Sequence, residues 1–211
     1  MTTDFDILIL STQDWDALPT RKHHWARNFA ARGNRVLYVE QQMHWLGWLV
    51  DWRRQFGRAW RWLSGPREVS ERLWVFTLPI VAPCFQMSSL INSFNNWLLA
   101  PVLRWALGRI HFKRVVLWAY TPHSAGLVDR MGEQLVVYEC VDEFSAARGL
   151  VRGKTIAAQE RQLLKLADIV IVTHPNLSQS KTIGERRPYL IPNGADTVSY
   201  THLTLPTSDL V

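Results

Sequence analysis

The sequence is short of the residues that several common protein classes need. Only two cysteines, Cys84 and Cys140, occur among its 211 residues, which is too few for a disulfide framework and indicates a reducing compartment. No uninterrupted apolar segment reaches the length of a membrane span, and the acidic start MTTDFD runs directly into a predicted strand, with no visible secretory signal. We therefore expect a cytoplasmic protein that is soluble or peripheral to a membrane.

Glycine is missing where a dinucleotide-binding protein needs it. A strand is predicted at residues 5–10 and a helix at residues 22–32, but the first glycine of the chain is Gly33, beyond that helix. The Gly-x-Gly-x-x-Gly phosphate turn is therefore absent, which disfavours a nucleotide-binding reductase or epimerase. No His, Cys or Asp cluster has metal-ligand spacing and no G-x-S-x-G turn occurs, so we expect neither a metal site nor a serine hydrolase.

Positive charge and tryptophan, by contrast, are in excess. The chain carries a formal net charge of +6 and contains 11 Trp. The charge indicates an acidic partner, of which nucleic acid is only one of several candidates. We predict an anionic membrane surface as the partner, and no nucleic acid, because of the composition of residues 43–63.

The run of residues 160–196 is the most informative about the fold. Its start, ERQLLKLAD, is typical of an amphipathic helix that ends at Asp168, and the β-branched run IVIV at residues 169–172 is typical of a strand covered on both faces. Further strands are predicted at residues 5–10, 35–39, 73–78, 115–118 and 135–138. Strands that alternate with helices predict an α/β fold, a Rossmann-like parallel sheet with helices on both faces.

Three segments resemble a known enzyme family. They are RKHHWARNFAARGNRVLYVE at residues 21–40, VVYECVDEFSA at residues 136–146, and ERQLLKLADIVIVT at residues 160–173 followed by IPNGAD at residues 191–196. In this order they are similar to family 4 glycosyltransferases of the teichuronic-acid, cell-envelope polysaccharide type, which have the GT-B fold. The resemblance covers most of residues 5–196. It implies transfer of a sugar from a nucleotide-sugar donor, with no further cofactor, to a lipid-linked or polysaccharide acceptor at the inner face of the plasma membrane.

The resemblance also implies a domain organisation. Residues 1–196 match the acceptor-side, Rossmann-like domain, whereas in this family the donor is bound chiefly by a second domain with two glutamates spaced eight apart. No two glutamates of this sequence have that spacing, so we expect the C-terminal donor-binding domain to be absent from it. Residues 197–211, TVSYTHLTLPTSDLV, are abruptly rich in Thr and Ser and resemble a non-native tail. The chain by itself is expected to be inactive.

Candidate site residues follow the predicted strands at the carboxyl edge of the sheet, where ligand sites gather in open α/β folds. Retaining relatives often carry a His close to the reacting sugar after the strand at residues 115–118; here Tyr120 occupies that position, with His123 nearby. The predicted catalytic residues are Asp142, His123 and Tyr120, in a site without metal. The predicted acceptor-binding residues are Arg21, Lys22, His23 and Glu143.

Four of these residues also have a plainer interpretation. Arg21 and Lys22 are equally typical of solvated residues at the start of a helix. Asp142 and Glu143 are equally typical of carboxylates that pair with basic residues or cap the next segment. Both interpretations stay open on the sequence alone.

Residues 43–63, MHWLGWLVDWRRQFGRAWRWL, predict a basic amphipathic helix. Trp beside Arg is typical of a helix in the membrane interface, with indoles at headgroup depth and guanidinium groups on lipid phosphates. The predicted membrane-binding residues are Trp45, Trp48, Trp52, Arg53, Arg54, Arg58, Trp60 and Arg61. A core helix is the alternative structure, and a non-catalytic membrane-docking domain that binds anionic lipid is the alternative function.

A second amphipathic region spans residues 90–107. We expect it to cover the sheet, with a bend or break near Pro101; the alternative is that it shares the membrane face of residues 43–63. Asn92, Asn95 and Asn96 would then supply its uncharged polar side.

Overall fold

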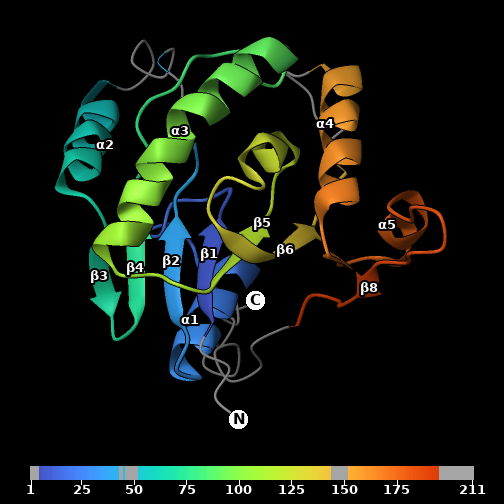
Figure 1. The fold of residues 1–211 in the computed structure, drawn as a ribbon, viewed down its shortest axis with the longest axis horizontal. Helices are drawn as coiled ribbons and strands as arrows, with labels where there is room; N and C mark the ends of the chain where they lie inside the picture. The colour runs from blue at the N-terminus through green and yellow to red at the C-terminus, as the bar shows by residue number, and fades with distance from the viewer. Residues whose placement is uncertain (1–4, 43–44, 46–51, 144–151, 195–211) are drawn as a thin grey trace, which may run out of the picture.

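The computed structural model describes residues 5–42, 45, 52–143 and 152–194. Its centre is an eight-stranded sheet in the order β3-β4-β2-β1-β5-β6-β7-β8 (Figure 1). The strands are β1 (Asp6–Leu10), β2 (Arg35–Val39), β3 (Arg67–Ser70), β4 (Leu73–Phe76), β5 (Val115–Ala119), β6 (Glu133–Cys140), β7 (Ile169–Val172) and β8 (Tyr189–Leu190). Neighbouring strands are parallel, apart from the antiparallel pair β3 and β4. The predicted Rossmann-like α/β sheet is confirmed.

The central strands β1 and β5 are apolar apart from Asp6 at the start of β1, because helices cover both faces of the sheet. β1 has the sequence DILIL and β5 has VVLWA, and every residue of both strands is buried. Successive side chains point to opposite faces, so Leu8 and Leu10 belong to one core and Ile7 and Ile9 to the other.

The two faces are covered unequally. α1 packs on one face through the buried Ala26, whereas α3, η2, α4 and α5 contribute to the core on the other face, with α2 beside α3 (Figure 1). The helices are α1 (Arg21–Ala31), α2 (Trp52–Ser64), α3 (Ser89–Arg109), the short 3-10 helix η2 (Pro122–Leu127), α4 (Gly153–Leu166) and α5 (Pro175–Ser180). None of the helices in the described ranges is long and apolar enough to cross a membrane.

The direction of the chain through the sheet reverses between β1 and β5. From β1 the chain moves outward to β2 and β4, and from β5 it moves the opposite way to β6, β7 and β8. In open α/β sheets the loops at such a reversal leave a crevice at the carboxyl ends of the strands. The start of α1 and the residues that follow β5 and β6 lie at this edge.

α3 covers the sheet, as expected, and the side that it buries carries three asparagines. The side-chain amide of Asn95 donates to the carbonyl of Ala82 (2.9 Å) and accepts from its amide (3.1 Å), while Asn92 and Asn96 each donate to the carbonyl of His123 (2.9 Å). All three asparagines are buried. These asparagines form an uncharged polar side that faces the protein interior, because buried backbone groups of the neighbouring segments need these amides as partners. The helix also continues through Pro101.

Candidate functional site

One arginine at the start of α1 joins three segments that are far apart in the sequence. Arg21 donates from Nε to Oε1 of Glu139, near the end of β6, and from Nη1 to the carbonyl of Pro192 (2.9 Å), which follows β8. The second carboxylate oxygen of Glu139 accepts a hydrogen bond from the indole of Trp118 on β5 (2.8 Å). Arg21, Glu139 and Pro192 belong to the three segments that carry the family resemblance.

Glu139 is the part of this site that the sequence prediction missed. It is fully buried on β6, among the side chains that face α1. A signal was present, because a carboxylate inside the apolar run VVYEC has to find a charged or hydrogen-bonding partner to be buried. Arg21 and Trp118 are those partners.

Lys22, the next residue of α1, is also buried at this edge. Its Nζ lies 5.2 Å from the centre of the Tyr120 ring, and among the residues that the structure describes no hydrogen-bond or ion-pair partner reaches it. Burial lowers the pKa of the Lys22 ammonium, and the charges of Asp142 and Glu139 act in the opposite direction. Lys22 is therefore an unpaired cation next to two carboxylates.

The structure brings Asp142 to this edge and leaves it exposed. Its carbonyl accepts from the thiol of Cys140 (3.3 Å), and its side chain lies close enough to Lys22 to influence the pKa of that residue. An exposed carboxylate beside a buried ammonium can accept a hydrogen bond from a ligand hydroxyl. The prediction for Asp142 stays open.

Tyr120 lies at the same place but inside the core. Its side chain is fully buried, and burial together with the neighbouring Glu139 carboxylate raises the pKa of its hydroxyl well above 10.0. A phenol in these surroundings stays protonated and has no access to solvent. The structure corrects the prediction that Tyr120 is a catalytic residue: its ring forms the wall on which Lys22 lies.

The structure places His123 on the other side of the sheet. Its ring packs against Phe85 (5.0 Å between centroids), its Nε2 lies 3.2 Å from Oγ1 of Thr121, and its carbonyl accepts from Asn92 and Asn96. Burial lowers the pKa of the imidazole to about 4. His123 thus contacts the α3 layer instead of Arg21 and Lys22, and the prediction that it shares a cleft with them is not supported by these contacts.

His23 has a structural role at the start of α1. Its Nδ1 accepts from the amide of Thr20 (3.0 Å), its Nε2 lies 3.2 Å from the carbonyl of Asp14, and its ring packs between Trp15 and Tyr38. Both nitrogens of the neutral ring are occupied by backbone groups, and burial lowers its pKa. This geometry fits a helix cap, so we withdraw His23 as an acceptor-binding residue.

Glu143 belongs to a separate ionic cluster. Lys181, which is buried, donates to both carboxylate oxygens of Glu143 (3.0 Å each) and to Oε2 of Glu160 (2.8 Å). The other oxygen of Glu160 accepts from the hydroxyl of Tyr138 (2.7 Å). Glu143 therefore pairs with a basic residue, which was the plainer of its two interpretations.

Part of the predicted basic amphipathic helix at residues 43–63 is present as α2 (Trp52–Ser64), and its binding to a membrane stays a prediction. Phe56, Trp60 and Leu63 form an exposed stripe, with about two thirds of each side chain accessible (63%, 67% and 66%). Trp45 is exposed as well, and Arg53 is exposed on the same helix. Trp48 and the side chains of Trp52 and Arg54 lie outside the described part of the structure.

Arg58 does not belong to that exposed surface. Only 1% of the residue is accessible, and its guanidinium group donates to Asp14 (2.5 Å) and to the carbonyl of Gln41 (2.6 Å) and lies 3.9 Å from Glu40. The prediction that Arg58 binds membrane lipid is therefore wrong, because a guanidinium neutralised inside the protein cannot contact a lipid phosphate. Arg61 is part of the surface and lies 3.4 Å from Asp16.

Comparisons with known proteins do not identify this arrangement. The chain matches no protein-family model, and a search of curated proteins also gives no match. Across the described ranges, no group of three His, Cys, Asp or Glu side chains is arranged to hold a metal ion. The chemistry of the site therefore has to be inferred from Arg21, Lys22, Glu139 and Asp142.

Proposed function

We propose that the protein is the acceptor-side domain of a glycosyltransferase, which moves a sugar from a nucleotide-sugar donor to a lipid-linked or polysaccharide acceptor at the cytoplasmic face of the membrane. The observation that carries this proposal is the set of contacts made by Arg21. They link residues 21–40, 136–146 and 191–196, which are three of the ranges that resemble family 4 glycosyltransferases, at the carboxyl edge of a sheet of the expected class.

The groups at this edge suit an acceptor that carries phosphate and hydroxyl groups. Nη2 of Arg21 is buried without a hydrogen-bond partner among the described residues, and a buried donor of this kind gains free energy when a ligand oxygen meets it. Lys22 adds a second cation, which has no hydrogen-bond or ion-pair partner among the described residues. Two such donors can hold the oxygens of a phosphate, while Glu139 fixes the direction of the Arg21 side chain.

Asp142 is the residue best placed to meet the attacking hydroxyl. It is exposed at this edge of the sheet, whereas Glu139 is fully buried and already accepts two hydrogen bonds. Its carboxylate would accept a hydrogen bond from the acceptor's hydroxyl group and would hold that hydroxyl oxygen in position to attack the sugar. The domain itself needs no cofactor for this task, because the donor is a substrate that a second domain would hold in enzymes of this type.

The test is the binding of a lipid-linked acceptor to the chain. A short-chain polyprenyl-diphosphate sugar in detergent micelles would be titrated against the wild-type protein and against Arg21→Gln. Loss of a charge-assisted pair should weaken binding about 10- to 100-fold. Arg27→Gln is the matched control, since Arg27 is exposed on the same helix and lies over the Trp15 ring instead of facing the site. Absence of saturable binding to the wild-type chain would refute the proposal.

A non-catalytic membrane-docking domain is the second candidate, and the exposed apolar stripe of α2 favours it. The Asp142→Asn variant distinguishes the two functions. A docking module would bind vesicles and show no change in any ligand affinity on Asp142→Asn. A glycosyltransferase domain would lose affinity for the acceptor or, in the presence of its donor-binding domain, turnover.

A further inference from the structure

Exposed aromatic side chains continue from α2 onto α3. Phe94, Trp97 and Trp105 of α3 are 54%, 63% and 46% accessible, which is unusual for large apolar residues that have a core within reach. We call this surface, together with Phe56, Trp60 and Leu63 of α2, the α2–α3 face. The two stripes meet where Leu63 and Trp105 line a groove of about 380 Å³ between the helices.

The charged residues of both helices of the α2–α3 face are all arginines, of which Arg61 pairs with Asp16 and Arg58 is neutralised inside the protein. Neither helix contains an Asp or Glu, whereas α3 carries Arg104 and Arg109 in addition to the arginines of α2. The membrane interface combines indole rings at headgroup depth with cations beside lipid phosphates, and this composition matches it. A second copy of the chain would instead bring Arg104 and Arg109 near their own counterparts, with no Asp or Glu on either helix to compensate them.

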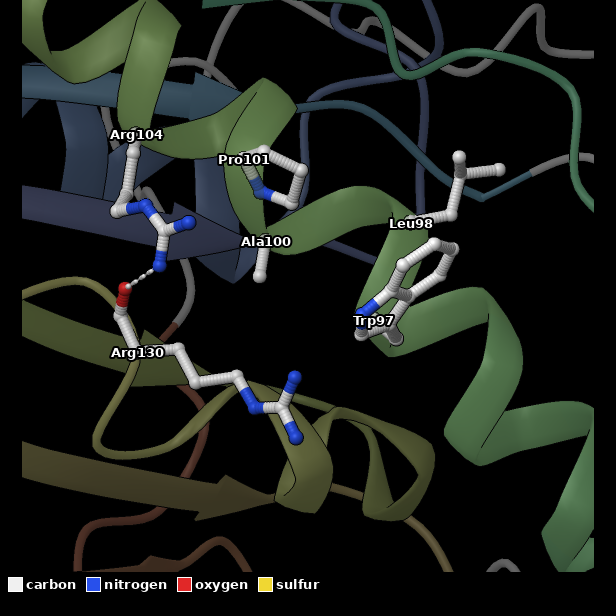
Figure 2. Close-up of a pocket in the computed structure, with 6 residues that line it drawn as sticks. All are labelled: Trp97, Leu98, Ala100, Pro101, Arg104 and Arg130. Carbon is white, nitrogen blue, oxygen red and sulfur yellow. Dashed lines mark hydrogen bonds between the residues drawn. The ribbon is translucent and has the colours of Figure 1, made fainter.

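A pocket opens at the edge of this face. It has a volume of about 210 Å³, and Trp97, Leu98, Ala100 and Pro101 form its apolar wall. Figure 2 shows Arg104 reaching from α3 toward the loop before β6, where its Nη1 donates to the carbonyl of Arg130 (3.3 Å), while the Arg130 side chain extends along the pocket. The pocket therefore holds two guanidinium groups next to an exposed indole.

Neither guanidinium group is paired with a carboxylate among the described residues. The nearby carboxylate of Glu133 is occupied, because it accepts from the amides of Asp129 (2.6 Å) and Met131 (2.9 Å). Arg104 uses one of its five N–H groups on a carbonyl, and the remaining donors of both side chains are left for a ligand. Paired arginines of this kind suit the oxygens of a phosphate.

We propose that Arg104 and Arg130 form a binding site for the phosphate of an anionic phospholipid, and that the α2–α3 face enters the membrane interface beside it. A lipid headgroup fits better than a free phosphate ion, because the pocket shares Trp97 with an apolar surface that the acyl region would cover. The site rests on the membrane location given under the proposed function, and it adds α3 and the loop before β6 to the helix that the sequence indicated.

The experiment is sedimentation of the chain with vesicles of phosphatidylglycerol or of phosphatidylcholine. Wild-type protein should bind the anionic vesicles, and Arg104→Gln/Arg130→Gln should lower the partition coefficient about 10- to 30-fold, as expected for two cations at the surface. The control is Arg32→Gln/Arg187→Gln, which removes two exposed charges from other parts of the fold and should change binding by less than about 3-fold. Circular dichroism and a melting curve establish that each variant is folded.

Further arms separate the possible outcomes. Trp60→Ser/Trp97→Ser should abolish the binding that survives at high salt; if it instead dissociates a dimer and leaves vesicle binding intact, the face is an interface between copies and the proposal fails. Displacement from vesicles by inorganic phosphate, but not by chloride at equal ionic strength, would assign the site to a free ion and overturn the lipid assignment. Equal losses in both arginine pairs would also overturn it. Arginine-dependent vesicle binding without acceptor binding would refute the glycosyltransferase proposal alone, and the reverse result would refute only this site.

Discussion

Replacing Arg58 by methionine should destabilise the protein far more than the same replacement at Arg61, three residues further along α2. Methionine keeps an unbranched apolar stem of similar reach and removes only the guanidinium group. The sequence does not distinguish the two arginines, because both lie in the same predicted amphipathic helix and beside the same tryptophans. The structure gives them opposite surroundings.

The expected difference follows from burial and geometry. Arg58 is 1% accessible and holds Asp14 at 2.5 Å and the carbonyl of Gln41 at 2.6 Å, with the fully buried Glu40 carboxylate 3.9 Å away. Removing one partner from a buried ionic group costs about 3–5 kcal/mol, since the remaining charges keep their desolvation cost. The Arg61 side chain is 35% accessible and its partner Asp16 61%, so this pair contributes about 0–1 kcal/mol.

Urea unfolding followed by tryptophan fluorescence would measure both variants, because the 11 Trp give a strong signal. A difference of about 2–5 kcal/mol is a large part of the 5–15 kcal/mol by which a domain is normally stable. Equal losses at the two positions, with unchanged dependence on urea, would refute the burial of Arg58. Arg58 would then belong to the exposed surface that is predicted to contact the membrane.

Three further results are expected. Gly126→Ala should cost about 1–3 kcal/mol, because its Cβ would lie 2.6 Å from Nδ2 of Asn96, whereas Gly57→Ala, with open space around it inside α2, should cost nothing or stabilise by up to about 1 kcal/mol; urea unfolding measures both. The pKa of His123 falls from 6.5 to about 4 on folding, so the unfolded chain binds the proton at a higher pH than the folded chain does. The protein should therefore lose stability as the pH drops from 6.5 toward 4. His123→Phe should flatten that part of the plot of stability against pH, and an unchanged plot would contradict the role of His123. In the enzyme with its donor-binding domain, Asp142→Asn should lower turnover about 10²- to 10⁴-fold without a change in melting temperature, and a lower melting temperature with normal kinetics would make Asp142 a structural cap.

The strands could be predicted because their signal is local. A β-branched run such as IVIV at residues 169–172 is typical of a strand in a sheet that is covered on both faces, and β7 occupies those residues. The carboxyl edge as the place of Arg21, Lys22 and Asp142 follows from the same pattern, since parallel strands end on one side. The structure places these three residues at that edge, where Arg21 contacts Glu139 and Pro192 and the charge of Asp142 acts on Lys22; their roles in binding stay predictions.

The sequence could not predict the surroundings of Arg58, His123 and Tyr120, because these depend on residues that are distant in the chain or on the course of a loop. Arg58 meets Asp14, which lies 44 positions earlier, and no periodicity in residues 43–63 distinguishes a buried arginine from an exposed one. His123 and Tyr120 follow the same strand, but a turn of three residues sends one toward α3 and the other toward α1. Which face a side chain reaches after the end of a strand is decided by the loop and by the packing around it.

The three asparagines of α3 fix the rotation of that helix about its own axis. Apolar residues lie on all its sides, so burial of hydrophobic surface alone would hardly favour one rotation over another. The amides of Asn92, Asn95 and Asn96 remove this freedom, because only one rotation lets them reach the carbonyls of Ala82 and His123. These directional hydrogen bonds keep Trp97 and Trp105 exposed, although apolar side chains tend to be buried. The exposed aromatic surface of α3 is therefore determined by the hydrogen bonds on the opposite side of the helix.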